Sequence, residues 1–369
     1  MKPRIIFVNG RFLTQPVTGV QRYAFELMRN IDKLLVEDIY SPKLKIICLA
    51  PSINFAIPNW EKIEIRRIGF GEQNIWEQLF LPLYVKSQLL FSPTNTGPWH
   101  YTNQVITFHD ASVFAVPHAY SSTFRTKYTF ILRQLSKRAS LILTDSKFSQ
   151  RELAQYLRID NTRFSVIHLG SDHLDNIQSD PQILHRHNLE RNKYLLLVGN
   201  HSLHKNFERI VQATSLLKID IKYVVVGGSF KKVFKENICN PLPSNIQNLG
   251  FVNDQELKTL YQNALGLIFP STYEGFGLPV LEAMRSGCPV LCANCASLPE
   301  VAGDAALYFD PFNVENIASV IDCFFANPQL QDQLRKKGYQ RSERFKWSST
   351  AINTVENILS VYTKVAVSK

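Results

Sequence analysis

One stretch of the sequence joins a buried strand, a glycine-rich turn and a helix start in close succession. An apolar run over 264–269 ends at Pro270, as a buried strand does before a loop. Gly275 and Gly277 follow, and glycine lets the backbone approach a ligand closely. Pro279 suits the first turn of a helix, where its missing N–H is not needed. Such a turn predicts an anion site, because free N–H groups and the helix dipole favour negative charge.

Two carboxylates flank this predicted anion site, Glu274 in the loop and Glu282 in the helix. A site for phosphate alone has no electrostatic use for acids. A ligand with phosphates in the middle and hydroxyl groups at both ends does, because carboxylates accept hydrogen bonds from sugar hydroxyls. A sugar nucleotide is such a ligand. The alternative is a surface loop followed by an ordinary amphipathic helix.

The Glu-x7-Glu spacing, with Gly-Phe-Gly-Leu-Pro inside it, strongly resembles the retaining glycosyltransferases of family 4, and among them bacterial mannosyltransferase-like members. The resemblance implies the GT-B fold, in which two doubly wound Rossmann-like α/β domains face each other across a cleft. It also implies that Glu274 meets hydroxyls of the donor sugar and Glu282 meets the nucleotide ribose. The resemblance also implies donor contacts from the turn, at Gly275, Phe276, Gly277 and Leu278. After an earlier strand, it implies backbone contacts to the base at Phe251 and Val252.

In the first half of the chain, Gly19 and His109 follow predicted strands over 5–8 and 105–108. Open α/β sheets bind ligands at this edge. The resemblance implies that Gly19 lies against the donor phosphates and that His109 contacts the transferred sugar. A neighbouring acid, Asp110, is predicted to set the local geometry or the charge of the imidazole. The alternatives are a helix-start glycine and a structural histidine.

In the second half, a predicted strand over 194–198 leads into a polar turn and then a helix over 208–217. This arrangement predicts a phosphate site that includes Asn200, His204 and Lys205. The family has Arg-Lys-Asn here, and its cations neutralise the leaving diphosphate. His204 replaces that arginine, and histidine is charged only part of the time near neutral pH. The alternative is a surface lysine.

His109, Lys205 and Glu274 are therefore the predicted catalytic residues. We expect no metal and no cofactor besides the nucleotide-sugar co-substrate, because the chain has no Asp-x-Asp motif and Lys205 would neutralise the phosphates. Cys292 and Cys295 have metal-like spacing but lack a second pair, which predicts reduced, packed thiols. With no clear second carboxylate for a two-step route, direct transfer on one face of the sugar is expected.

The 369 residues suit two domains, and both halves alternate strands with helices, which predicts parallel sheets. We predict an acceptor-side domain over 1–175 and a nucleotide-sugar domain over 190–342. The polar stretch 171–192 is the predicted linker. The resemblance implies that 343–369 forms a helix that crosses back to the first domain.

The net charge of +10 is uneven, since residues 1–172 hold 21 Lys+Arg and 13 Asp+Glu. This basic half and the basic amphipathic helix predicted over 119–139 favour contact with an anionic membrane surface, unless the apolar face of that helix is core. Nucleic acid is not an expected partner, because no nucleic-acid module is recognisable. The N-terminus has too short an apolar run for a secretory signal, so we expect a cytoplasmic protein, peripheral on the inner face of the membrane.

The resemblance implies a retaining transferase that moves a hexose to a hydroxyl of a glycan or lipid-linked acceptor. His109-Asp110 and the Thr-Gly-x-x-Arg-Tyr sequence at 18–23 resemble members that use GDP-mannose, so mannose is the favoured sugar. One alternative is a nucleotide-sugar epimerase of the same fold, which would convert the donor with no acceptor. Another is a non-catalytic sugar-nucleotide-binding protein, because the usual arginine is replaced by His204. A nucleic-acid binder is suggested by charge alone and would show a salt-dependent affinity for DNA or RNA.

Overall fold

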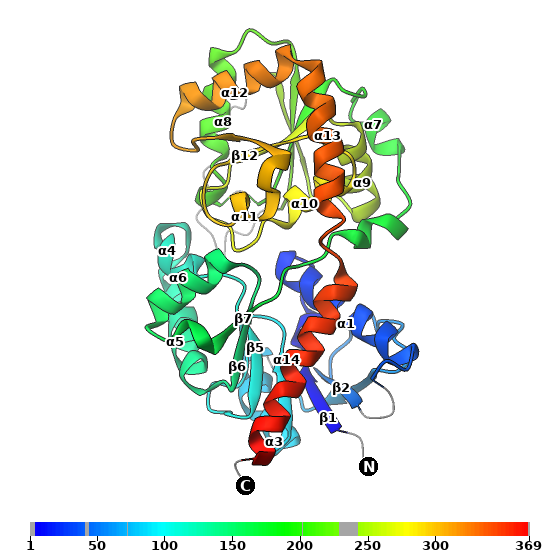
Figure 1. Cartoon of the computed structure of the whole chain (residues 1–369), viewed down its shortest axis with the longest axis vertical. Coiled ribbons are helices and arrows are strands. Elements are labelled where there is room, and N and C mark those ends of the chain that lie inside the picture. Colours follow the sequence, from blue (N-terminus) through cyan, green and yellow to red (C-terminus); the bar gives the residue numbers. More distant parts are fainter. Residues whose placement is uncertain (1–3, 41–43, 72, 201, 229–242, 368–369) are drawn as a thin grey trace. The chain divides into compact units, whose positions relative to one another are not determined.

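The computed structural model describes residues 4–40, 44–71, 73–200, 202–228 and 243–367. The chain divides into two compact units, each built on its own parallel sheet (Figure 1). The first unit comprises Met1–Ala111, Lys127–Gly170 and Lys346–Lys369, and the second comprises Ser112–Thr126 and Ser171–Phe345.

The sheet of the first unit has the strand order β3-β2-β1-β4-β5-β6-β7, with every pair parallel. From β1 the chain therefore winds first to one side and then, from β4 onward, to the other. The strands are β1 (Arg4–Asn9), β2 (Leu44–Pro51), β3 (Glu64–Ile68), β4 (Leu89–Ser92), β5 (Gln104–Thr107), β6 (Leu141–Thr144) and β7 (Phe164–Val166).

The sheet of the second unit has the order β10-β9-β8-β11-β12-β13 and is also parallel. Its winding reverses between β8 and β11, as that of the first sheet does between β1 and β4. In open α/β sheets, ligands bind outside the carboxyl ends of the strands at this reversal. The strands are β8 (Tyr194–Val198), β9 (Lys222–Val226), β10 (Ile246–Gly250), β11 (Gly266–Phe269), β12 (Val290–Ala293) and β13 (Ala306–Phe309).

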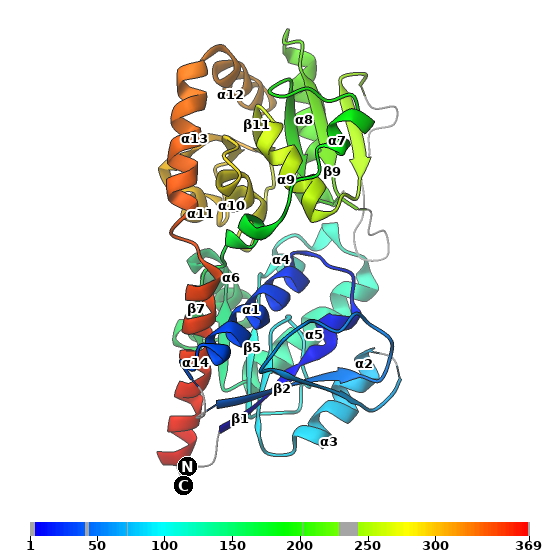
Figure 2. The ribbon, with the colours of Figure 1, turned by 90° about the vertical axis from the view of Figure 1, so that its right-hand side faces the viewer.

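Helices connect the strands and pack on the sheets (Figure 2). The longer ones are α1 (Gly19–Val36), α5 (Ser122–Arg138), α6 (Lys147–Leu157), α8 (Phe207–Leu216), α9 (Asp254–Asn263), α10 (Leu278–Arg285), α12 (Val314–Ala326), α13 (Pro328–Ser342) and α14 (Trp347–Val367). The short ones are α2 (Gln73–Ile75), α3 (Leu81–Val85), α4 (Ser112–Ala115), α7 (Gln182–Arg186) and α11 (Leu298–Ala302).

The sequence of the central strands explains the parallel architecture. All residues of β4, β5, β11 and β12 are buried, and these strands are short, mainly apolar runs without strict alternation. A strand that is buried on both faces has this pattern, because helices cover each side of a parallel sheet. The predicted fold class, with two doubly wound parallel-sheet domains, is confirmed.

The C-terminal helix α14 belongs to the first unit, where it packs along α1 (Figures 1 and 2). Trp347 is buried, and its backbone passes directly beside Gly170. A Cβ atom on Gly170 would lie 2.2 Å from the Trp347 nitrogen, so only glycine allows this approach. The Thr350 hydroxyl donates to the carbonyl of His168 at 2.8 Å, which holds the two segments together.

Two segments differ from the predicted organisation. Ser112–Thr126 groups with the second unit, although the predicted first domain included it. The predicted linker over 171–192 contains a short 3-10 helix, Asp172–Asn176, and α7. Its polar side chains explain both its linker-like composition and its packing, since they form ion pairs with α9 and α10. Among the described residues, no helix is both long enough and apolar enough to cross a bilayer.

Candidate functional site

The reversal point of the second sheet brings together the two loops that the sequence singled out. Lys205 ends the short helix Leu203–Lys205 after β8, and Glu274 lies in the loop after β11. The Lys205 Nζ atom lies 2.5 Å from Glu274 Oε1, and 14% of each side chain is exposed. The same ammonium lies 5.5 Å from the centre of the Phe269 ring. The structure thus combines the predicted phosphate-binding cation and the predicted sugar-binding carboxylate in one ion pair.

The glycine-rich turn is held in place by the backbone conformation of Gly277 and by a buried serine. Gly277 has a φ of +100° and precedes the first residue of α10, and this left-handed conformation favours glycine. The Ser297 hydroxyl lies 2.9 Å from the carbonyl oxygen of Glu274 and 2.8 Å from that of Phe276. The first turn of α10 carries no acidic residue, so its N-terminus is suited to an anion. Ser297 was not among the predicted site residues.

His204 is buried and does not supply a second cation at neutral pH. Burial and the neighbouring positive charge of Lys205, together with His118, lower the pKa of His204 to about 3. The imidazole Nε2 lies 3.3 Å from the Ser202 hydroxyl, and the backbone N–H of Thr272 donates to the His204 carbonyl at 2.8 Å. His204 therefore helps to join the loops after β8 and β11 instead of replacing the arginine of the family.

Two asparagines shape the loop after β8. The Asn200 side-chain oxygen accepts hydrogen bonds from the N–H and the hydroxyl of Ser202, at 3.2 and 2.6 Å. The Asn206 amide donates to the carbonyls of Pro270 and Pro311, at 3.2 and 2.8 Å. Asn206 thus ties this loop to the loop after β11, while Asn200 orients the chain just before Lys205.

Glu282, the predicted ribose-binding carboxylate, lies on α10 and is 7% exposed. Its Oε2 accepts a hydrogen bond from the Tyr261 hydroxyl at 3.2 Å, and its Oε1 lies 3.2 Å from His173 Nε2. Neither His173 nor Tyr261 was a predicted site residue. His173 stands in the segment predicted as a linker, and Tyr261 has the position of a core residue on α9.

Phe251 and Val252, the positions predicted near the base, follow β10 at the carboxyl edge of the same sheet. β10 is an outer strand, two strands away from β8. The Phe251 side chain is 76% exposed, so its aromatic face is available at this end of the sheet.

In the first unit, His109 follows β5 and is buried between acceptors. Its Nδ1 lies 2.7 Å from Asp145 Oδ2, and its Nε2 lies 3.1 Å from the carbonyl oxygen of Pro93. Burial alone would lower the pKa of His109, but the Asp145 carboxylate, the charge of Asp110 and the Pro93 carbonyl outweigh it and raise the pKa. The Tyr23 ring packs edge-on against the imidazole, with ring centres 4.8 Å apart.

This geometry adds one residue to the sequence interpretation. The carboxylate that binds the imidazole is Asp145, while the charge of the adjacent Asp110 also raises the pKa of His109, which is one of the two roles predicted for Asp110. The reason is strand order: β5 pairs with β6, so the residue after β6 lies beside the residue after β5. With acceptors at both nitrogens, the ring favours the doubly protonated, positively charged form.

Gly19 is the first residue of α1, after the N-cap residue Thr18. A Cβ atom at Gly19 would meet no other atom within 4 Å, and its φ is not in the left-handed region. The fold itself therefore does not require glycine here. The donor contact of Gly19 stays a prediction, and a ligand that approaches the start of α1 would be a physical reason for the missing side chain.

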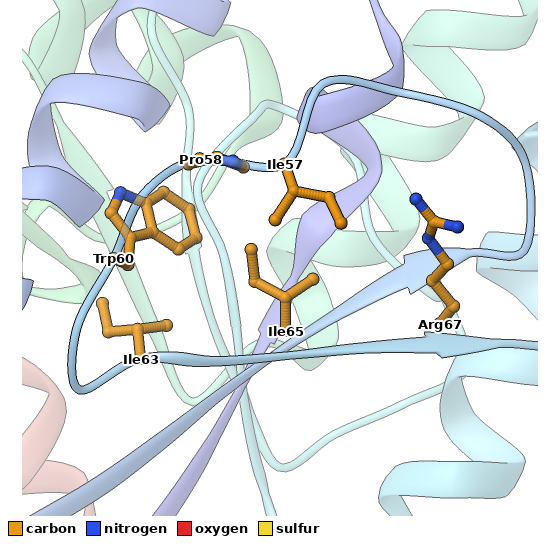
Figure 3. Close-up of a pocket in the computed structure, with 6 residues that line it drawn as sticks. All are labelled: Ile57, Pro58, Trp60, Ile63, Ile65 and Arg67. Atoms are coloured by element: carbon orange, nitrogen blue, oxygen red, sulfur yellow. The ribbon is translucent and has the colours of Figure 1, made fainter.

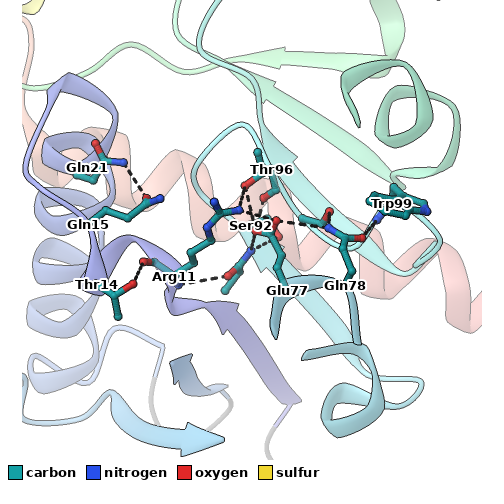
Figure 4. A network of polar contacts seen from close by, with 11 residues as sticks. Arg11, Thr14, Gln15, Gln21, Glu77, Gln78, Ser92, Thr96 and Trp99 are labelled. Atoms are coloured by element: carbon teal, nitrogen blue, oxygen red, sulfur yellow. Dashed lines mark hydrogen bonds and ion pairs between the residues drawn. The ribbon is translucent and has the colours of Figure 1, made fainter. Parts of the chain in front are cut away.

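A buried polar network lies at the reversal point of the first sheet, near the carboxyl ends of β1 and β4 (Figure 4). Glu77, which is 1% exposed, accepts from Asn9 at 2.8 Å, from Arg11 at 2.9 Å and from Thr96 at 2.9 Å. Glu77 lies in a π-helical turn, Trp76–Phe80, a feature frequent at functional sites. The sequence interpretation did not include this network.

A cavity of about 460 Å³ lies elsewhere in the first unit, beside β3 (Figure 3). Its lining is mostly apolar: Ile57, Pro58, Trp60, Ile63, Ile65 and Arg67. Ile65 and Arg67 lie on β3, and the other lining residues precede it. Because β3 is the edge strand, this cavity is separate from the loops at the reversal point between β1 and β4.

The basic helix predicted over 119–139 corresponds mainly to α5. Its apolar residues Ile131, Leu132 and Leu135 are buried in the protein, while Lys127, Arg133, Lys137 and Arg138 are exposed. Part of the apolar face of α5 is therefore core, whereas Phe130 is 51% exposed, and a basic face remains at the surface.

The cysteines that the structure describes are free thiols, with Cys288 and Cys292 buried. Cys295 donates weakly to the carbonyls of Ser271 and Thr272, at 3.6 and 3.5 Å. Cys239 lies outside the described residues. Over the described ranges, no three His, Cys, Asp or Glu side chains gather into a group that could hold a metal ion.

Residues 180–341 match the family model described as glycosyl transferases group 1. The chain is 28% identical to the O-antigen chain mannosyltransferase B of Escherichia coli, over 95% of this chain and 98% of that protein. It is 29% identical to the O-antigen chain mannosyltransferase RfbU of Salmonella typhimurium, over 86% of this chain and 90% of that protein.

Among solved structures, the sucrose-phosphate synthase of Thermosynechococcus elongatus superimposes over the full length of both chains, with a TM-score of 0.74 and 16% identity. At this identity, the likeness bears on the fold alone.

Proposed function

Since the chain is a glycosyltransferase with a GT-B fold, we propose that it transfers a mannosyl residue from GDP-mannose to a hydroxyl of a glycan or lipid-linked acceptor. One observation carries the proposal: the Lys205–Glu274 pair lies at the reversal point of the second sheet, where the loop of Glu274 leads into α10. A cation and a helix N-terminus suit a diphosphate, and the adjacent carboxylate suits sugar hydroxyls. The names of the two O-antigen mannosyltransferases support mannose and a polysaccharide product.

The main work of catalysis in this proposal is electrostatic. As the bond between sugar and diphosphate breaks, negative charge grows on the departing phosphate oxygens. Lys205 and the α10 N-terminus stabilise that charge, because both are fixed before the reaction begins. Glu274 accepts hydrogen bonds from the sugar, and His109, held by Asp145, offers positive charge at the carboxyl end of β5.

Direct transfer on one face of the sugar, with retained configuration, is the route that we propose. A two-step route needs a carboxylate nucleophile with a second acid nearby. Glu274 is already paired with Lys205 at 2.5 Å, which lowers its ability to act as a free nucleophile. A covalent sugar trapped on Glu274 would contradict this route.

We propose that the enzyme acts at the cytoplasmic face of the membrane. The exposed basic residues of α5 are the proposed contact with anionic lipid. Vesicle sedimentation with anionic and with neutral lipid tests this. Binding to anionic vesicles should fall when Lys127, Arg133, Lys137 and Arg138 are changed to Gln. Equal binding to both kinds of vesicle would exclude the electrostatic contact.

A thermal-shift screen and product analysis test the function. We expect GDP and GDP-mannose to raise the melting temperature more than UDP, dTDP and their sugar conjugates, because a ligand of the native state stabilises it. Glu282→Ala should reduce the shift. With a saccharide acceptor, the product should be a mannosylated acceptor plus GDP. Conversion of the donor sugar without acceptor would instead indicate an epimerase.

A further inference from the structure

We propose that His173 and Tyr261 are positioning residues that hold the Glu282 carboxylate in the orientation that receives the donor ribose. This inference rests on the proposed function, because it takes the ribose as the partner of Glu282. It assigns a role to a segment that the sequence presents as a linker, and to a tyrosine that the sequence presents as core.

The burial of Glu282 makes its partners important. A carboxylate that is 7% exposed has little water around it, and an ionised group in such a place needs nearby donors. His173 Nε2 lies 3.2 Å from Oε1, and the Tyr261 hydroxyl lies 3.2 Å from Oε2. Each carboxylate oxygen thus has its own partner from a different element, which fixes the rotation of the group.

The Tyr261 hydroxyl donates a hydrogen bond to Glu282, whereas His173 Nε2 lies within ion-pair distance of Oε1 without the geometry of a hydrogen bond. Burial and the charge of Glu282 raise the pKa of Tyr261 well above its usual value, so its hydroxyl keeps its proton at neutral pH. The His173 side chain is 1% exposed and lies within the packed unit. Each carboxylate oxygen can accept more than one hydrogen bond, so Glu282 keeps acceptor capacity for ribose hydroxyls.

The segment that carries His173 is fastened to the two helices that frame Glu282. Arg285 of α10 forms a bidentate pair with Asp175, with Nε–Oδ1 and NH2–Oδ2 distances of 2.8 and 2.5 Å. Lys258 of α9 donates to the carbonyls of Leu174 and Ile177, at 2.8 and 2.7 Å. These contacts are made within four residues after His173, so the segment that carries its imidazole is held against α9 and α10.

Loss of His173 or Tyr261 as a partner of Glu282 should weaken donor binding more than it slows the chemical step. A Glu282 carboxylate that has lost one of its two partners can rotate away from the ribose, although it stays in place on α10. The Kd for nucleotide and the KM for donor should rise, while kcat should change little, because the ribose is far along the donor from the bond that breaks.

The test is calorimetric titration of the full chain with GDP, UDP and dTDP, together with donor KM and kcat. His173→Leu should weaken nucleotide binding about ten- to a hundredfold. His173→Gln, which keeps an N–H donor near the Nε2 position, should restore most of the affinity. Tyr261→Phe removes only a hydroxyl and should weaken binding in the same way. His185→Ala changes an exposed histidine of α7 and serves as the matched control.

A double-mutant cycle separates positioning from general packing. In a Glu282→Ala background, His173→Leu and Tyr261→Phe should cause no further loss of affinity, since the group that they orient is gone. If Glu282→Ala weakens binding while His173→Leu and Tyr261→Phe bind like the wild type, the inference is wrong and the proposed function stands. If the wild type binds none of the three nucleotides, the proposed function fails and the inference falls with it.

Discussion

Lys205 and Glu274 stand 69 positions apart in the sequence, and their side chains meet at 2.5 Å across the ends of two strands. The pair links the residue proposed for the phosphates to the residue proposed for the sugar. Each charge therefore compensates the other, and each holds the other in position. A donor that binds here meets a preorganised cation and a preorganised acceptor.

Replacing Lys205 tests the electrostatic part of the mechanism. Lys205→Ala should lower kcat about 10²- to 10³-fold, the usual effect of removing one donor that stabilises transition-state charge. Lys205→Arg keeps the charge with a different shape and should retain part of the activity. Steady-state kinetics with GDP-mannose and the melting temperature of each variant provide the measurement. A Lys205→Ala enzyme within tenfold of the wild type would remove Lys205 from the mechanism.

His204 should behave as a neutral group. Its folded pKa of about 3 is below the value of roughly 6.5 in the unfolded chain, so below pH 6.5 the unfolded chain binds a proton that the native state does not. Stability is therefore present above pH 6.5 and is lost on acidification, by up to about 1.4 kcal/mol per pH unit. His204→Gln should remove this dependence. Urea unfolding of both proteins at pH 7 and pH 5 measures the difference.

The same substitution probes catalysis. Because the wild-type imidazole is already uncharged at neutral pH, His204→Gln should keep the transfer rate within a few-fold at pH 7.5. A large loss there, with an intact fold, would show that a charged His204 contributes after all.

His109 should show the opposite pH dependence. Its pKa is raised on folding, so the native state keeps a proton that the unfolded chain releases. The stability that it contributes is complete below pH 6.5 and is lost as the pH rises through the folded pKa. His109→Gln should lack this loss. Asp145→Asn leaves the buried imidazolium without its carboxylate and should cost about 3–5 kcal/mol at pH 6, measured by urea unfolding.

Two glycines of the first unit should respond very differently to alanine. Gly19→Ala places its methyl group in open space and should change the free energy of unfolding by less than about 0.5 kcal/mol. Gly19→Val should nevertheless weaken donor binding, because its side chain extends toward the proposed phosphates. Gly170→Ala, whose methyl group would lie 2.2 Å from Trp347, should destabilise the protein strongly. Thermal unfolding and nucleotide titration distinguish the two effects.

Chelation tests the proposed absence of a metal requirement. Lys205 and the α10 N-terminus would neutralise the diphosphate, so EDTA should leave the rate of transfer unchanged. Loss of activity that a divalent ion restores would show that a metal shares this role.

The parallel sheets and the Lys205–Glu274 region could be predicted from the sequence, because short apolar runs and strand-end loops follow from local patterns. The partner of His109 could not be predicted from its neighbour in sequence. Asp145 follows β6, and only the pairing of β5 with β6 brings its carboxylate to the imidazole. The order of the strands in the sheet, which the sequence pattern does not reveal, was therefore needed to identify Asp145 as the partner of His109.

Two other structural features could not be predicted from the pattern of apolar and polar residues in the sequence. The apolar positions of α5 fit a membrane surface and a protein core equally well, and only the packed structure shows that Ile131, Leu132 and Leu135 are core. The contact of His173 with Glu282 joins residues 109 positions apart, and neither periodicity nor composition marks His173. Long-range contacts of single polar side chains leave no local signal in one sequence.

The packing of α14 on α1 has a consequence for synthesis of the protein on the ribosome. In the part of the chain that the structure describes, all seven strands of the first sheet precede those of the second sheet, but α14, which begins at Trp347 and packs on α1, follows the second sheet. The second unit is a continuous segment from Ser171 to Phe345 apart from Ser112–Thr126, so all of its residues are translated before α14. The unit whose strands are translated first is thus the unit whose packing is completed last.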